Sequence, residues 1–147
     1  MIKMEGEGYS FEEHTSDVII VARGKTLERA FEYIAKGLME IMTNPSQIDI
    51  KEKKELKVNG FDLENLLYRW VEEFLYLFDA EGFLAREIKV EKIEKLNEEY
   101  LVNGVAYGER YNERKHESRT HVKAPTYSQI NVTRESDLWK LKITVDI

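Results

Sequence analysis

Two stretches of the chain repeat apolar residues every three or four positions, which is the spacing of one face of an α-helix. The first follows Thr26, a residue type that caps helix N-termini, and stops at Asn44-Pro45. The second follows Asp62 and ends at Gly82, and its apolar positions are Leu63, Leu66, Leu67, Trp70, Val71, Phe74, Leu75 and Phe78. Such a stripe suits either a partner groove or a core, and a chain of 147 residues needs it for its own core. We therefore expect two amphipathic helices.

The other segments alternate apolar and polar residues with the two-residue period of β-strands. We expect strands on both sides of a turn at residues 14–17, and then over residues 51–58, 83–93, 100–107, 121–132 and 138–145. Turn-forming residues separate them at 59–60, 97–99 and 135–137. Strands that flank two helices and then follow one another predict an α+β fold. The expected architecture is a mixed or antiparallel β-sheet packed with two amphipathic helices, with residues 1–147 forming a single domain.

Composition narrows the classes of function. The chain has 28 acidic and 22 basic residues, and this excess of negative charge argues against a protein whose whole surface follows nucleic acid. It has no cysteine, which excludes disulfides, thiolate zinc sites and cysteine catalysis. No apolar run is long enough for a membrane span, and the N-terminus lacks the apolar segment of a signal peptide. We expect a cytoplasmic protein with no membrane partner.

The sequence lacks the motifs of a self-sufficient catalyst. It contains no phosphate-binding glycine loop, no G-x-S-x-G elbow and no H-E-x-x-H helix. Its histidines are His14, His116 and His121. The last two are five residues apart in or beside a predicted strand, so we expect them to point to opposite faces rather than share a metal.

Two acidic positions at predicted strand ends are candidate metal ligands. Asp17 directly precedes an apolar strand, and Asp146 and Ile147 close the last one. If these strand ends lie together, the two side chains and the terminal carboxylate of Ile147 form an oxygen-rich pocket suited to a hard divalent cation. The plainer alternative is that Asp17 ends a turn and Asp146 is solvated. Composition and spacing alone favour this alternative.

Residues 109–123 are the one cationic stretch in this acidic chain. Its basic residues are Arg110, Arg114, Lys115, Arg119 and Lys123, with His116 among them and tyrosines interleaved. Guanidinium groups beside aromatic rings suit contacts with phosphates and bases, and they also suit docking to an acidic protein. The alternative is a solvated loop that carries its own ion pairs.

Four segments, taken in order along the chain, resemble the archease family, the small protein cofactors of RtcB-type RNA ligases. They are EHTSDV at residues 13–18, NLLYRWVEE at 65–73, VKAPTY at 122–127 and VDI at 145–147. Length, acidity and the lack of cysteine also match the family. Two positions depart from its usual pattern: Ser16 stands where alanine is common, and Ser128 stands where many members carry histidine.

The resemblance implies a function that the residue patterns alone do not. It implies a metal site formed by Asp17, Asp146 and Ile147, the last through its carbonyl or terminal carboxylate. It also implies a protein cofactor, not an enzyme, which promotes guanylylation and multiple turnover of an RtcB-type RNA ligase in tRNA splicing. All-oxygen ligation favours calcium, magnesium or manganese over zinc. The cationic residues named above would bind the ligase, and any contact with tRNA would be indirect.

Two other classes of function remain open at this point. A metal-dependent hydrolase or nuclease would use Asp17, Asp146 and a histidine, and it would turn over substrate by itself. A chaperone or RNA-binding module would act through residues 109–123, and its affinity for RNA would fall steeply with salt.

Overall fold

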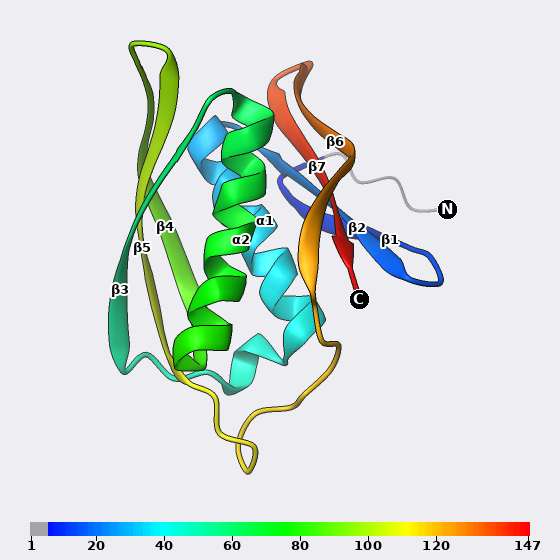
Figure 1. The fold of residues 1–147 in the computed structure, drawn as a ribbon, viewed down its shortest axis with the longest axis vertical. Helices are drawn as coiled ribbons and strands as arrows, with labels where there is room; N and C mark the ends of the chain where they lie inside the picture. Colours follow the sequence, from blue (N-terminus) through cyan, green and yellow to red (C-terminus); the bar gives the residue numbers. More distant parts are fainter. Residues whose placement is uncertain (1–5) are drawn as a thin grey trace.

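The computed structural model describes residues 6–147, which form seven strands, two α-helices and one short 3-10 helix (Figure 1). In chain order the elements are β1 (Gly8–Glu13), β2 (Asp17–Gly24), α1 (Leu27–Met42), η1 (Pro45–Gln47), β3 (Glu52–Gly60), α2 (Leu63–Glu81), β4 (Phe83–Leu96), β5 (Glu99–Arg110), β6 (Ala124–Glu135) and β7 (Leu138–Asp146).

The two helices lie between two β-sheets (Figure 1). One sheet has four strands in the order β1-β2-β7-β6, and the other has three in the order β3-β5-β4. Every strand pair in these two sheets is antiparallel. The α+β prediction is therefore confirmed, but the strands divide into two sheets where one was expected. Each sheet covers one side of the helical layer, and one side of α2 remains exposed between the sheets (Figure 1).

Local sequence signals start and stop the helices as expected. Thr26 accepts a hydrogen bond from the backbone of Arg29 at 3.0 Å, and Asp62 accepts one from Asn65 at 2.7 Å. Gly82 ends α2 in the left-handed conformation, with φ of 68°, which glycine adopts without a steric penalty.

The predicted stripe of α2 faces the core. Six of its eight apolar positions are buried and the two outermost are half-buried. Trp70 is fully enclosed, and its indole N–H donates to the backbone oxygen of Phe31 in α1 at 3.0 Å. The core interpretation of this stripe is confirmed.

Most predicted strand ends differ from the structure by one to three residues, and two predicted assignments are wrong. Residues 121–123 lie outside β6, which begins at Ala124. Residues 59–60 form no turn, since both belong to β3. Gly60 is small for another reason: a Cβ there would lie 2.6 Å from the backbone nitrogen of Leu66, because the strand end passes close to α2. Among the described residues, no helix is long and apolar enough to cross a membrane.

Candidate functional site

The register of β2 and β7 sets Asp17 directly opposite Asp146. Directly opposed residues of an antiparallel pair project from the same face, with Cβ atoms about 5 Å apart. Two further backbone bonds hold this end of the sheet together. The N–H of Ile147 donates to the oxygen of Ser16 at 3.1 Å, and the N–H of Lys123 donates to the oxygen of Asp146 at 2.8 Å. The two strand ends therefore lie together.

The alternation of side chains places the two aspartates on the outer face of the sheet. Their neighbours Val18 and Val145 belong to the core, and successive residues of a strand point to opposite faces. Ile147 packs against the same core, so its side chain lies away from the aspartates. It can contribute to a site with them only through its backbone oxygens.

Neither aspartate is in an ion pair with any residue that the structure describes. Asp17 is half-buried and Asp146 is exposed. Over the same part of the chain, no three side chains of His, Asp or Glu gather as metal ligands. Proteins commonly hold magnesium through one or two carboxylates while the ion keeps several of its waters. Two carboxylates and a backbone oxygen at this strand end would provide such a ligand set. The residues present therefore fit a hard divalent cation, but not a site made of side chains alone.

Position 128 lies beside this strand end. The pairing of β6 with β7 is interrupted between Thr126 and Asn131, and within this irregular segment the oxygen of Ser128 accepts the Thr144 hydroxyl at 2.8 Å. Thr144 is two residues from Asp146 and shares its face of β7. The backbone of Ser128 therefore lies beside the face of β7 that carries Asp146.

A pocket of about 430 Å³ lies on the other side of Ile147. Its lining combines apolar side chains with charged ones: Phe11, Glu13, His14, Val18, Glu40, Ile41, Arg119, Thr120 and Ile147. Arg119 pairs with Glu40 of α1 and belongs to the segment that connects β5 to β6. The pocket therefore joins the strand end to the cationic segment.

The cationic segment is anchored by a buried carboxylate, that of Glu109. It lies 3.0 Å from Nε2 of His116 and 2.6 Å from Nζ of Lys115, and Lys51 approaches it at 3.5 Å. The backbone N–H of Asp49 also donates to it, at 2.7 Å. Burial by itself would raise the pKa of this carboxyl. The bonds from Asp49, Lys115 and His116 outweigh burial and lower the pKa to about 2.

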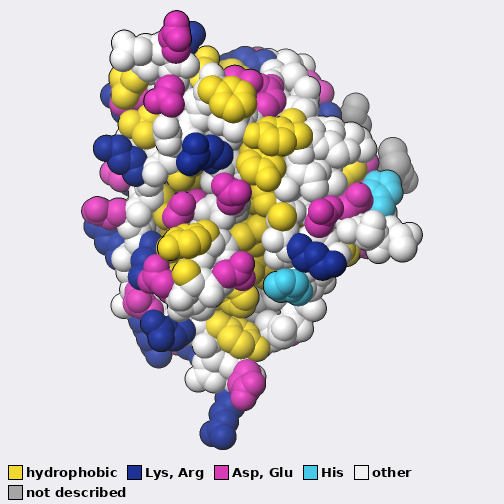
Figure 2. All heavy atoms as spheres, in the orientation of Figure 1, with side chains coloured by type: hydrophobic (Ala, Val, Ile, Leu, Met, Phe, Trp, Pro, Cys, Tyr) yellow, Lys and Arg dark blue, Asp and Glu magenta, His cyan; other side chains and the backbone are white. Residues whose placement is uncertain are grey.

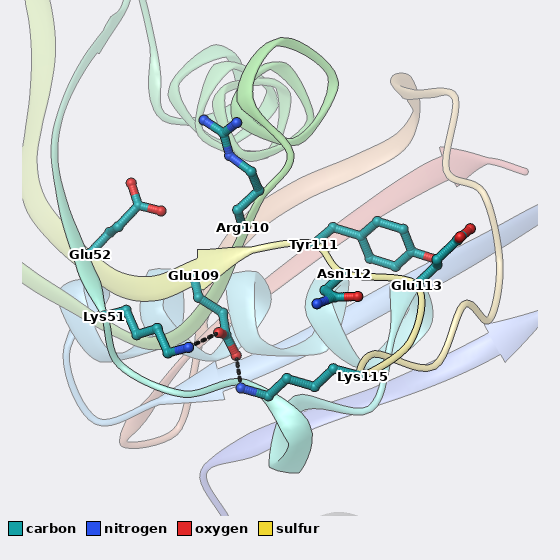
Figure 3. A pocket seen from close by; sticks show the side chains of 8 residues that line it. All are labelled: Lys51, Glu52, Glu109, Arg110, Tyr111, Asn112, Glu113 and Lys115. Atoms are coloured by element: carbon teal, nitrogen blue, oxygen red, sulfur yellow. Dashed lines mark ion pairs between the residues drawn. The ribbon is translucent and has the colours of Figure 1, made fainter.

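Figure 3 shows the pocket of about 620 Å³ that contains this carboxylate. Both lysines point toward Glu109, whereas Arg110 points away from it toward the end of α2. Three basic side chains line the pocket together with three acidic ones: Lys51, Arg110 and Lys115 with Glu52, Glu109 and Glu113. This balance of charge makes the pocket a poor site for an anion.

The six residues predicted to bind a partner fall into two groups. Three hold the segment in place: His116 is buried, Lys115 bridges Glu109 and Asp49, and Arg119 pairs with Glu40. The other three form no ion pair with a described residue, and they are Arg110, Arg114 and Lys123. Sequence patterns did not reveal Glu109 as the anchor, because its partners come from a distant segment and from the loop itself.

The fold places two helices between two antiparallel sheets, and two carboxylates face each other at a strand end. These features define a class of small α+β protein with a candidate cation site and no catalytic motif. The model of the archease protein family (MTH1598/TM1083) matches residues 9–147. The chain belongs to the archease family, whose members are known as activators of RtcB-type RNA ligases and are generally non-catalytic accessory proteins.

Two relatives and one solved structure support this assignment over nearly the full length. The chain is 39% identical to protein archease of Aeropyrum pernix over 98% of this chain and 100% of that protein. It is 42% identical to protein archease of Pyrococcus furiosus over 92% of this chain and 95% of that protein. The solution structure of protein 1598 of Methanobacterium thermoautotrophicum matches with a TM-score of 0.82 at 31% identity, covering 95% of this chain and 99% of the other.

Proposed function

We propose that this protein is a metal-binding cofactor of an RtcB-type RNA ligase, acting in tRNA splicing to promote guanylylation and multiple turnover of the ligase. Family membership supports the choice of partner. The observation that carries the metal site is the opposition of Asp17 and Asp146, two carboxylates at one strand end that form no ion pair with any residue from 6 to 147.

The protein's own residues provide the ligands and their placement. Asp17 and Asp146 offer side-chain oxygens from one face, and Ile147 offers a backbone oxygen from the end of the same sheet. The backbone bonds from Ile147 to Ser16 and from Lys123 to Asp146 keep these groups together before any cation arrives. A bound calcium, magnesium or manganese ion would supply positive charge next to the phosphates and carboxylates of a nucleotide-transfer site.

The test is a ligation assay with an RtcB-type ligase at limiting divalent metal, with and without this protein. We expect the protein to raise both the guanylylated fraction of the ligase and the number of turnovers. Asp146→Asn preserves the size of the side chain and removes its charge, and it should reduce this activation at least tenfold. Asp137→Asn is the matched control, since Asp137 is an exposed aspartate at the other end of β7.

Three results would overturn the proposal. Full activation by both Asp17→Asn and Asp146→Asn would remove the metal site from the function. Hydrolysis of RNA or nucleotide by the isolated protein would indicate an enzyme. Tight, strongly salt-dependent binding of RNA without any effect on the ligase would indicate an RNA-binding module.

A further inference from the structure

The exposed side of α2 carries aromatic and acidic side chains in turn. Tyr68, Glu72 and Tyr76 are four residues apart, so they lie along one side of the helix. Tyr127 of β6 stacks on Tyr68, with ring centroids 4.3 Å apart and ring planes 2° from parallel. We call these four residues the α2 aromatic face. Figure 2 shows hydrophobic side chains gathered in a band down the middle of this view, over α2 and its border with β6.

Hydrogen bonds hold the stacked pair in place. Asn65 is buried at the start of α2, and its side-chain oxygen accepts the backbone N–H of Phe61 at 3.1 Å. Its side-chain nitrogen donates to the hydroxyl of Tyr127 at 2.6 Å. The ring of Tyr127 is therefore oriented before any partner arrives, and a pre-ordered contact loses less entropy on binding.

This region carries half of the large apolar side chains that the described part of the chain exposes. Tyr76 is 60% exposed, Tyr127 is 50% exposed, and Phe61, next to the N-cap of α2, is 68% exposed. Exposed aromatic residues grouped together mark interaction surfaces, and tyrosine is enriched among the residues that dominate binding energy.

The charge along the exposed side of α2 is predominantly negative. Along α2, Glu64, Glu72, Glu73 and Asp79 form no ion pair with a described residue, and Arg69 is the one basic residue of the helix. Partial burial, and then the neighbouring Glu72, raise the pKa of Glu73, and the positive charge of Arg69 offsets only part of this rise. A cation from a partner would relieve this accumulation of negative charge.

We propose that the α2 aromatic face docks an arginine-bearing segment of the RtcB-type ligase, an inference that rests on the function proposed above. A guanidinium group stacks on a tyrosine ring and forms a two-point hydrogen bond with a carboxylate, and Tyr68, Glu72 and Tyr76 offer both in alternation. Stacked rings also suit nucleobases, but the carboxylates between them repel phosphates. The charge therefore selects a basic protein segment over RNA.

The experiment measures binding of purified RtcB-type ligase to the full chain and its variants. Glu72→Lys combined with Tyr76→Ala changes two exposed side chains and breaks no hydrogen bond or ion pair of the structure. We expect it to weaken binding at least tenfold and to reduce the salt dependence of the affinity. Leu96→Ala combined with Glu98→Lys is the matched control at the exposed tip of the β4–β5 hairpin, and it should bind as the wild type does.

A metal-site variant separates this inference from the proposed function. Asp146→Asn should fail to activate the ligase even at a saturating concentration, whereas the α2 variant should activate it again at higher concentration. Wild-type protein that neither binds nor activates the ligase would overturn both proposals. If the wild-type protein activates the ligase and the α2 variant binds the ligase equally well, only the proposal that the α2 aromatic face docks the ligase is overturned.

Two other occupants give different results. A single-stranded RNA oligonucleotide that binds the wild type but not the α2 variant, with ligase binding unaffected, would assign the face to RNA. Sedimentation showing a dimer that the α2 variant disrupts, again with ligase binding unaffected, would assign it to a second copy of the chain. Either result would overturn docking of the ligase there.

Discussion

The carboxylate of Glu109 and the imidazole of His116 lie 3.0 Å apart in the interior of the protein. Nδ1 of His116 accepts the backbone N–H of Asn112 at 2.8 Å, so we infer that Nε2 carries the proton that is donated to Glu109. The end of β5 and the segment that follows it are thus joined through a buried carboxylate. This contact shapes the part of the chain that sequence patterns suggested was a docking loop.

The low pKa of Glu109 makes stability depend on pH. Its folded-state pKa of about 2 lies below the ordinary value of 4.5, so its stabilising effect is fully present above pH 4.5. It is lost progressively as the pH falls from about 4.5 to about 2. We expect chemical denaturation to show a smaller pH dependence in this range for Glu109→Gln than for the wild type. Equal slopes for the two proteins would show that Glu109 is not the responsible group.

Trp70 should be the most costly single truncation in α2. Its side chain is fully enclosed and hydrogen-bonded to Phe31 of α1, so Trp70→Ala leaves a cavity and an unpaired oxygen. The expected loss in free energy of unfolding is about 3–5 kcal/mol. Denaturation by urea measures it, with exposed Tyr76→Ala as the control. A melting temperature unchanged by Trp70→Ala, together with lost ligase activation, would instead make this residue part of an interface.

A divalent cation should stabilise the fold through Asp17 and Asp146. At a free concentration a hundred times its Kd, the stabilisation is about 2.7 kcal/mol, which a thermal melt detects readily. Without metal, Asp17→Asn should stabilise the protein by roughly 0.5 kcal/mol, because it removes one of two opposed like charges. The same variant should lose the response to metal. A metal-induced rise in melting temperature that survives in both Asp17→Asn and Asp146→Asn would place the cation elsewhere.

The cationic segment should divide into docking and structural residues. Reversing Arg110, Arg114 and Lys123 to Glu should weaken functional association with the ligase and change the melting temperature by no more than about 3 °C, because none of the three is in an ion pair with a described residue.

Arg119→Ala provides the contrast for this prediction. Arg119 donates to the backbone oxygen of Glu40 at 2.9 Å and also pairs with its carboxylate, so the substitution should lower the melting temperature. Activation that is unchanged across a range of salt in the triple reversal would remove these three residues from docking.

Much of the secondary structure could be predicted because its signals are local. The apolar repeat of α2, with Asp62 before it and Gly82 after it, marks a helix whatever the rest of the chain does, since caps and periodicity act within a few residues. Alternation in the strands is equally local. The prediction of a turn at residues 59–60 failed because Gly60 has a tertiary role. The residue is small because α2 passes beside it.

The arrangement of these elements was decided only by the tertiary structure. Four features depend on contacts between residues far apart in the sequence. They are the division of seven strands into two sheets, the opposition of Asp17 and Asp146, the burial of His116 and the stacking of Tyr68 on Tyr127. Period-two patterns specify which residues share a face but not which strand lies alongside, because pairing and register depend on the packing of the whole chain. The sequence by itself determined the candidate ligands, and the register of two strands from opposite ends of the chain brought them together.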